Sequence, residues 1–134
     1  MIELLQLSQV LDAVRSTGTE VRYYDKDCKT GGFAGYYQFS SNVDRLVICP
    51  DNQRNHSDLF DTVRHEAIHV VQACNQGKPI LAYDYYVTNA SRETWSKIEG
   101  YPEEHKHHEI EAFHAAEHLN EKQVINLINK FCFE

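Results

Sequence analysis

The five residues His65-Glu66-Ala67-Ile68-His69 carry the clearest chemical pattern in the sequence. Residues four apart on a helix lie on one face, so the imidazoles of His65 and His69 can both reach one zinc ion at about 2.0–2.1 Å. Glu66 is offset by about 100° around such a helix, so its carboxylate points beside the metal. That position suits a general base that takes a proton from water and passes it to a leaving amine. The pattern therefore predicts a zinc-dependent hydrolytic centre.

A catalytic zinc ion usually has three protein ligands and a water, so this pattern needs one more ligand. The stretch 105–114 is rich in histidine and glutamate, and a helical wheel separates its two central carboxylates. Glu109 falls on the apolar side, where a buried carboxylate needs a partner such as a metal ion. Glu111 falls on a polar side that we expect to be wet. The apolar side holds Ala112, Phe113 and Ala116, and the polar side holds His107, His114 and His118. Glu109 is the expected third ligand, and Glu111 or a nearby histidine is the alternative.

Helices and a small sheet have to position these groups. Apolar spacing, followed by Gly77 and Pro79, predicts the metal-binding helix at about 58–76. Two runs rich in β-formers, 36–40 and 45–49, predict an antiparallel hairpin just ahead of it. The remaining predictions are helices at 2–15, 91–99, 103–119 and 121–131, a strand at 21–25 and a loop at 80–90. The predicted fold class is α+β.

Length and composition limit what kind of protein this is. The 134 residues suit one domain spanning 1–134, with 42% hydrophobic and 25% charged residues. A formal net charge of −7 disfavours nucleic-acid binding. The longest unbroken apolar runs have four residues, far short of the roughly 20 that span a membrane. We therefore expect neither a nucleic acid nor a membrane as a partner, and the oligomeric state stays open.

The first residues lack the basic region and cleavage site of a signal peptide, so we expect a cytoplasmic protein. In that reducing compartment the cysteines would be thiols, buried as small hydrophobic residues. The four are Cys28, Cys49, Cys74 and Cys132, and they form no Cys-x-x-Cys pair. A Cys49–Cys74 disulfide stays open as an alternative, because these residues flank the predicted metal-binding helix.

His-Glu-x-x-His followed on a later helix by Glu109-x-x-Ala112 resembles the gluzincin group of zinc metallopeptidases. The resemblance covers roughly residues 36–118 and includes single-domain phage and bacterial metallopeptidases. It implies a zincin-like, minimal metallopeptidase core in which His65, His69 and Glu109 bind zinc. It also implies that Glu66 is the general base.

The resemblance carries further expectations for the cleft. An edge strand beside it would pair with an extended peptide substrate, and residues 45–49 occupy the matching place. Many gluzincins orient a ligand histidine with an Asp or Asn shortly after Glu-x-x-Ala, where this chain has Phe113. We expect Asp61 or a backbone carbonyl to take that role. Candidates for stabilising the transition state are Tyr83, Tyr85, Tyr86 and Tyr101, together with one histidine among His105, His107 and His108.

These patterns predict a zinc metallopeptidase that hydrolyses peptide bonds in a peptide or protein substrate. The alternative is a structural zinc-binding module, or a catalytically inactive one, that acts in protein interaction. A structural site would fill its fourth position with protein, and Cys49 or a histidine between 105 and 108 could supply it. The substrate and its cleavage specificity stay open.

Overall fold

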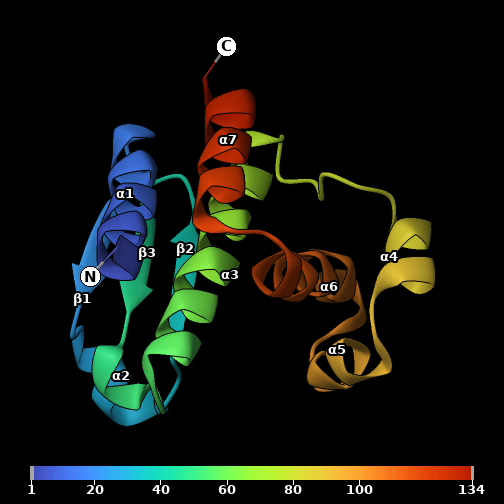
Figure 1. The fold of residues 1–134 in the computed structure, drawn as a ribbon, viewed down its shortest axis with the longest axis horizontal. Helices are drawn as coiled ribbons and strands as arrows, with labels where there is room; N and C mark the ends of the chain where they lie inside the picture. The colour runs from blue at the N-terminus through green and yellow to red at the C-terminus, as the bar shows by residue number, and fades with distance from the viewer. Residues whose placement is uncertain (1, 134) are drawn as a thin grey trace.

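The structure is a computed structural model that describes residues 2–133, and these residues form an α+β fold. Figure 1 shows α1 and the strands at one side, α4, α5 and α6 at the other, and α3 and α7 between them. The elements in chain order are α1 (Ile2–Ser16), β1 (Glu20–Tyr23), α2 (Lys26–Gly31), β2 (Gly35–Phe39), β3 (Asp44–Ile48), a 3-10 turn (Pro50–Asn52), α3 (His56–Cys74), α4 (Tyr83–Asn89), α5 (Arg92–Lys97), α6 (Glu103–His118) and α7 (Glu121–Cys132).

The three strands form a mixed sheet in the order β1-β3-β2. The predicted hairpin is confirmed, because β2 and β3 pair antiparallel. The prediction of a purely antiparallel sheet with an edge strand at 45–49 is wrong, since β3 is central and fully buried at Leu46, Val47 and Ile48. The cause is a parallel pairing of β1 with β3, in which Glu20 lies opposite Arg45. The edge strand on the hairpin side is therefore β2.

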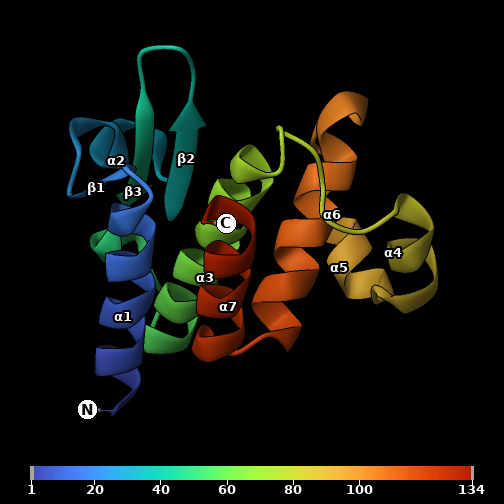
Figure 2. The ribbon, with the colours of Figure 1, turned by 90° about the horizontal axis from the view of Figure 1, so that it is seen from above.

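Helix α3 belongs to both the core and the candidate site. Its Val63, Ala67, Val70 and Val71 side chains pack into one apolar cluster with residues of α1, β3 and α7. Figure 2 shows α1, α3 and α7 in a row, with α6 beyond them. The helix follows the sheet and the 3-10 turn at Pro50–Asn52. Asn55 caps it by accepting the backbone N–H of Asp58 at 2.9 Å. A rigid, half-buried helix therefore carries the His-Glu-x-x-His residues.

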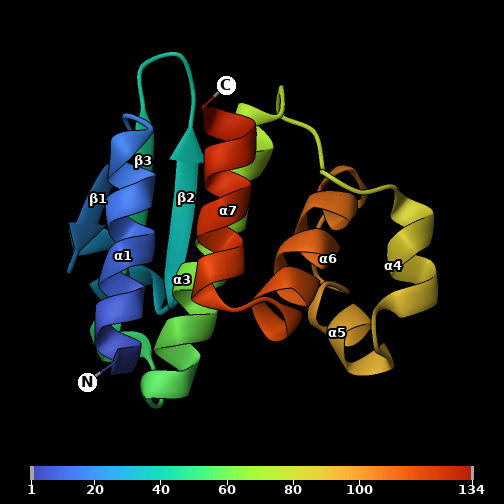
Figure 3. The same ribbon diagram turned by 45° about the horizontal axis from the view of Figure 1, so that its top comes forward.

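Residues 80–90 contain helix α4 instead of the predicted loop. Figure 3 shows α4 on the outer side of α6. The Tyr86 side chain is buried there, and its hydroxyl donates to Glu111 of α6 at 2.7 Å. A contact with a distant helix thus decides the conformation of this short segment. The helices predicted at 91–99, 103–119 and 121–131 are confirmed as α5, α6 and α7. None of the helices in residues 2–133 has the length and apolar character needed to cross a membrane.

Two disulfides link the four cysteines, so the prediction of free thiols is wrong. Cys28 of α2 pairs with Cys49 after β3, and Cys74 at the end of α3 pairs with Cys132 at the end of α7. The Cys49–Cys74 alternative is also wrong, because each of these residues has a different partner. Disulfides persist in oxidising compartments, which weighs against the expected cytoplasmic location.

Candidate metal centre

Three side chains converge between α3 and α6. The Oε1 atom of Glu109 lies 3.1 Å from His65 Nε2 and 3.2 Å from His69 Nε2. The His65 side chain is buried and those of His69 and Glu109 are about 15% exposed. His65, Glu66 and His69 also offer ligand atoms that all lie within 4.8 Å of one another. The folded chain thus brings together all four residues that the sequence singled out.

This donor set fits zinc. Two atoms bound to zinc at about 2.0–2.1 Å in a tetrahedron lie roughly 3.3–3.4 Å apart, close to the two distances measured here. Two imidazole nitrogens and one carboxylate oxygen are also ligands that catalytic zinc ions take. Without a metal, a carboxylate oxygen can only accept, so each histidine Nε2 must carry a proton where zinc would bind.

A proton and a metal ion would compete for the same nitrogen of His69, and the charges around that nitrogen decide how strongly the proton is held. Burial opposes a charge on His69, but the hydrogen bond to Glu109 and the charges of Glu66 and Glu109 outweigh it and raise the pKa of His69 to about 9. Burial likewise opposes a charge on Glu109, and the hydrogen bonds from both histidines outweigh it and hold the pKa of that carboxyl far below its usual range. A metal ion bound at His69 would have to displace a proton below about pH 9, so its apparent affinity would rise as pH rises towards that value.

The residue that orients His69 is Gln72, which the sequence did not single out. Its Oε1 accepts the Nδ1–H of His69 at 2.8 Å, which leaves Nε2 directed at Glu109 Oε1. The Gln72 amide in turn donates to Glu111 Oε1 at 3.0 Å and to the His108 carbonyl at 3.1 Å. The expectation for Asp61 is wrong, because that carboxylate pairs with Arg64.

Glu111 lies in the protein interior, so the prediction that its side of the helix is wet is wrong at this residue. It is 2% exposed, and its two oxygens accept the Ile80 and Leu81 backbone N–H groups, the Tyr86 hydroxyl and the Gln72 amide. These donors come from α3, α4 and the segment between them. Glu111 is therefore a support for Gln72 and not a ligand candidate, since its lone pairs are already used.

His65 lacks such an orienting partner within residues 2–133. Its buried Nδ1 atom has no hydrogen bond, and its ring packs against Phe113, with the ring centroids 4.3 Å apart. Phe113 stands where the resemblance leads us to expect Asp or Asn, and it contacts the His65 ring instead of accepting a hydrogen bond from it. The two histidines are thus fixed by different means, one by packing and the other by hydrogen bonding.

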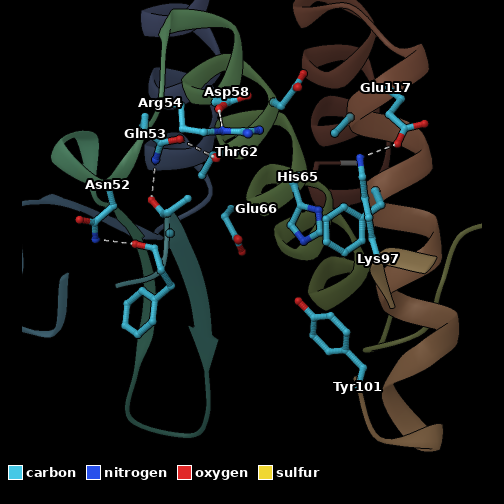
Figure 4. A pocket seen from close by; sticks show the side chains of 16 residues that line it. Asn52, Gln53, Arg54, Asp58, Thr62, His65, Glu66, Lys97, Tyr101 and Glu117 are labelled. Atoms are coloured by element: carbon cyan, nitrogen blue, oxygen red, sulfur yellow. Dashed lines mark hydrogen bonds and ion pairs between the residues drawn. The ribbon is translucent and has the colours of Figure 1, made fainter. Parts of the chain in front are cut away.

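A cavity of about 500 Å³ opens beside these residues, between α3, the start of β2 and the α5–α6 region. Figure 4 shows Glu66 and His65 projecting into it from α3, with the Tyr101 hydroxyl pointing toward them from the opposite side. The Glu66 side chain makes no hydrogen bond or ion pair with any other group of the described residues, so no protein donor occupies its carboxylate oxygens. Burial, and then the charges of Glu109 and Glu66, raise the pKa of Tyr101 to about 12, so its hydroxyl remains a donor at neutral pH.

The other candidates for polarising a substrate do not line this cavity. Tyr86 is used by Glu111, and the tyrosines at 83 and 85 lie on α4. His107 and His108 each place Nε2 at 2.8 Å from a backbone carbonyl, that of Leu81 and that of Gly77. These two histidines hold the connection between α3 and α4 against α6. Tyr101 is the remaining candidate.

The side of the cavity that faces α6 is formed by residues that no sequence pattern marked as functional. Gln53 donates to the carbonyls of Ala34 and Cys49 and accepts the Thr62 hydroxyl, which joins the start of β2 to α3. Gly35 is needed here, because a Cβ atom would lie 2.8 Å from the Val47 carbonyl oxygen and 3.0 Å from Thr62 Cγ2. The edge strand β2 is thereby held close to the helix that carries His65 and Glu66.

Comparison with known proteins gives a family but no activity. The model of one family, described as a domain of unknown function (DUF8637), matches residues 2–133. The chain belongs to the DUF8637 family. No curated protein and no solved structure matches this DUF8637 domain. Its chemistry must therefore be inferred from the site itself.

If zinc binds His69 as the sequence predicts, replacing Gln72 by leucine is expected to weaken zinc binding about 10–100-fold, because outer hydrogen-bond partners of a ligand histidine typically contribute that much. The change keeps the side-chain volume but removes the acceptor for His69. Calorimetric zinc titration would measure it, with Gln9→Leu on the exposed side of α1 as the control. Unchanged zinc affinity in a folded Gln72→Leu protein would show that Gln72 does not orient His69.

Proposed function

We propose that this DUF8637 domain is a zinc-dependent peptidase with a zincin-like core. The observation that carries the proposal is the convergence of His65 Nε2, His69 Nε2 and Glu109 Oε1 within 3.2 Å contacts, beside a free Glu66 carboxylate in an open cavity. The arrangement of a metal-binding helix next to a small sheet, with a glutamate on a later helix, supports the same reading.

The chain's own groups can perform the steps of peptide hydrolysis. Zinc, when bound, would polarise the scissile carbonyl and lower the pKa of water. Glu66 would take the proton of the attacking water and transfer it to the leaving amine, since it is the unpaired carboxylate next to the histidines. Tyr101 would donate a hydrogen bond to the oxygen on which negative charge develops, a role that needs a protonated hydroxyl.

A peptide substrate would bind along β2. This strand is the edge of the sheet, its first residue lines the cavity, and its free backbone groups can pair with an extended peptide without demanding a particular sequence. Residues 45–49 were expected in this role, but their backbone groups are used in pairing with β1 and β2.

Three residues that could supply the fourth ligand of a structural zinc ion already have other partners. Cys49 is joined to Cys28, and His107 and His108 hydrogen-bond to backbone carbonyls. An open fourth position, as in catalytic zinc sites, therefore suits the arrangement better. A catalytically inactive binding module remains the competing hypothesis that activity measurements must exclude.

The proposal is tested with the disulfide-bonded protein, stripped of metal by a chelator and then titrated with zinc. We expect one zinc ion per chain and at least about a 100-fold loss of affinity in His65→Ala, because two ligands hold zinc far more weakly than three. His105→Ala is the matched control, since this exposed histidine lies outside the cavity.

A peptide library with mass-spectrometric readout then tests hydrolysis. The zinc-loaded protein should cleave peptides, and chelation should abolish cleavage and zinc should restore it. If the wild-type chain binds no zinc, the metal centre is refuted. If it binds zinc and cleaves nothing in the library, the binding-module hypothesis replaces the peptidase.

A further inference from the structure

A second cavity lies away from the metal centre, between α6 and α7. Its volume is about 340 Å³, within the range of small-molecule sites. Most of its wall is apolar. The apolar residues come from α3, from α6 and the residue after it, from α7, and from the segment that joins α3 to α4; they are Ile68, Ile80, Leu81, Ala115, Leu119, Leu127 and Phe131. A ligand for this cavity must therefore have an apolar body.

One carboxylate, that of Glu111, lines this cavity, and it does not need a cation as its partner. Glu111 is among the lining residues, but its carboxylate already accepts from two backbone N–H groups, the Tyr86 hydroxyl and the Gln72 amide. A buried carboxylate with that many donors is satisfied without a further positive charge. The negative charge of Glu111 is therefore compensated from the protein side.

The remaining charged or titratable groups around this cavity include a lysine and two histidines, each of which can donate a hydrogen bond. Lys130 is an exposed residue that lines the cavity, with its Nζ atom 5.5 Å from the Phe131 ring centroid, and it forms no salt bridge with any side chain that the structure describes. His114 and His118 lie beside each other, with ring centroids 4.3 Å apart, and neither pairs with a carboxylate in the described residues. Burial, and then the charge of the neighbouring His118, lower the pKa of His114, which disfavours a charge on His114 at neutral pH. Lys130 thus places one positively charged side chain beside an apolar cavity in a chain of net charge −7.

From this combination we infer that the cavity binds a small carboxylic acid with an apolar tail. The tail would lie between Ala115 and Leu127, and the carboxylate would pair with Lys130, with His114 or His118 as a hydrogen-bond donor. This site goes beyond the proposed peptidase function and does not depend on zinc, because neither the three proposed ligands nor Glu66 lines it, and Glu111, which does, only supports Gln72.

Octanoate is a suitable probe, and octan-1-ol and octylammonium are its neutral and cationic counterparts. We expect octanoate to bind the chelator-treated protein about fivefold more tightly than octylammonium, because the exposed Lys130 attracts a carboxylate and repels an ammonium group, each effect being small at a solvated position. Methyl NMR shifts should identify the place of binding, with Leu119 and Leu127 responding to octanoate.

Two substitutions on α7 then separate this site from general surface charge. Lys130→Glu should weaken octanoate binding about fivefold and favour octylammonium, whereas Lys122→Glu, an exposed residue outside the cavity, should leave both within about twofold. Equal binding of the three probes, methyl shifts elsewhere, or an unchanged affinity in Lys130→Glu would overturn the inference. So would shifts of Leu119 and Leu127 that follow protein concentration alone, which would indicate a second copy of the chain in the cavity.

Discussion

Replacing Glu66 by glutamine is expected to lower kcat for peptide hydrolysis about 100–10,000-fold, the range that a positioned general base contributes. Glutamine keeps the shape of the side chain but cannot take a proton from water. Its zinc affinity should stay within a few-fold of the original, because the proposed ligands are His65, His69 and Glu109. Steady-state cleavage of a peptide from the library and a zinc titration would measure the two quantities.

The control for this experiment is Glu104→Gln, an exposed acidic residue at the start of α6 that lies outside the cavity. It makes the same chemical change and should leave kcat unaltered. A Glu66→Gln protein with full activity would refute the role of Glu66 as the base. Loss of zinc together with activity would instead mean that Glu66 helps to bind the metal.

Removing the Cys74–Cys132 disulfide by a double change to serine is expected to lower the free energy of unfolding by about 4 kcal/mol. The bond joins residues 58 apart, and a crosslink stabilises mainly by restricting the unfolded chain, more so for a longer loop. The melting temperature should fall by about 10 °C or more. Chemical and thermal unfolding, followed by circular dichroism, would measure both changes.

The Cys28–Cys49 disulfide provides the comparison. It spans 21 residues, so its removal should cost about 3 kcal/mol, less than the longer crosslink. It also lies next to the cavity wall, where Asn52 donates to the carbonyls of Cys28 and Phe33 at 2.8 Å. Its loss should therefore raise KM at temperatures where the protein is still folded, while the Cys74–Cys132 variant should keep its KM. The opposite order of the two effects on stability, or no difference in KM, would contradict this assignment.

Features encoded within a short stretch of chain could be predicted from the sequence. The positions of His65, Glu66 and His69 on one helix follow from the helical repeat, which needs no tertiary information. The helices at 103–118 and 121–132 follow likewise from local apolar periodicity and capping, such as the reciprocal bonds of Asn120 and Gln123. The inward direction of the Glu109 side chain could also be predicted from the sequence, because its neighbours on a helical wheel are apolar.

Features that depend on distant segments were decided only by the tertiary structure. Glu111 was assigned to a wet face because its wheel neighbours are histidines, yet Ile80, Leu81 and Tyr86 supply the donors that allow its burial. The central place of β3 likewise depends on β1, which joins the strand from the side away from its hairpin partner. A helical wheel or a hairpin pattern contains neither contact.

The sequence by itself therefore determined which residues could bind zinc and act as a base, since their spacing along one helix sets their relative directions. The tertiary structure decided what surrounds them: Gln72 and Glu111 behind His69, β2 as the open edge, and two disulfides in place of four thiols. The physical reason is that each of these depends on packing between α3, α6, α7 and the sheet. Such packing brings buried polar groups to hydrogen-bond partners far away in the chain, and these partners offset the free-energy cost of burial.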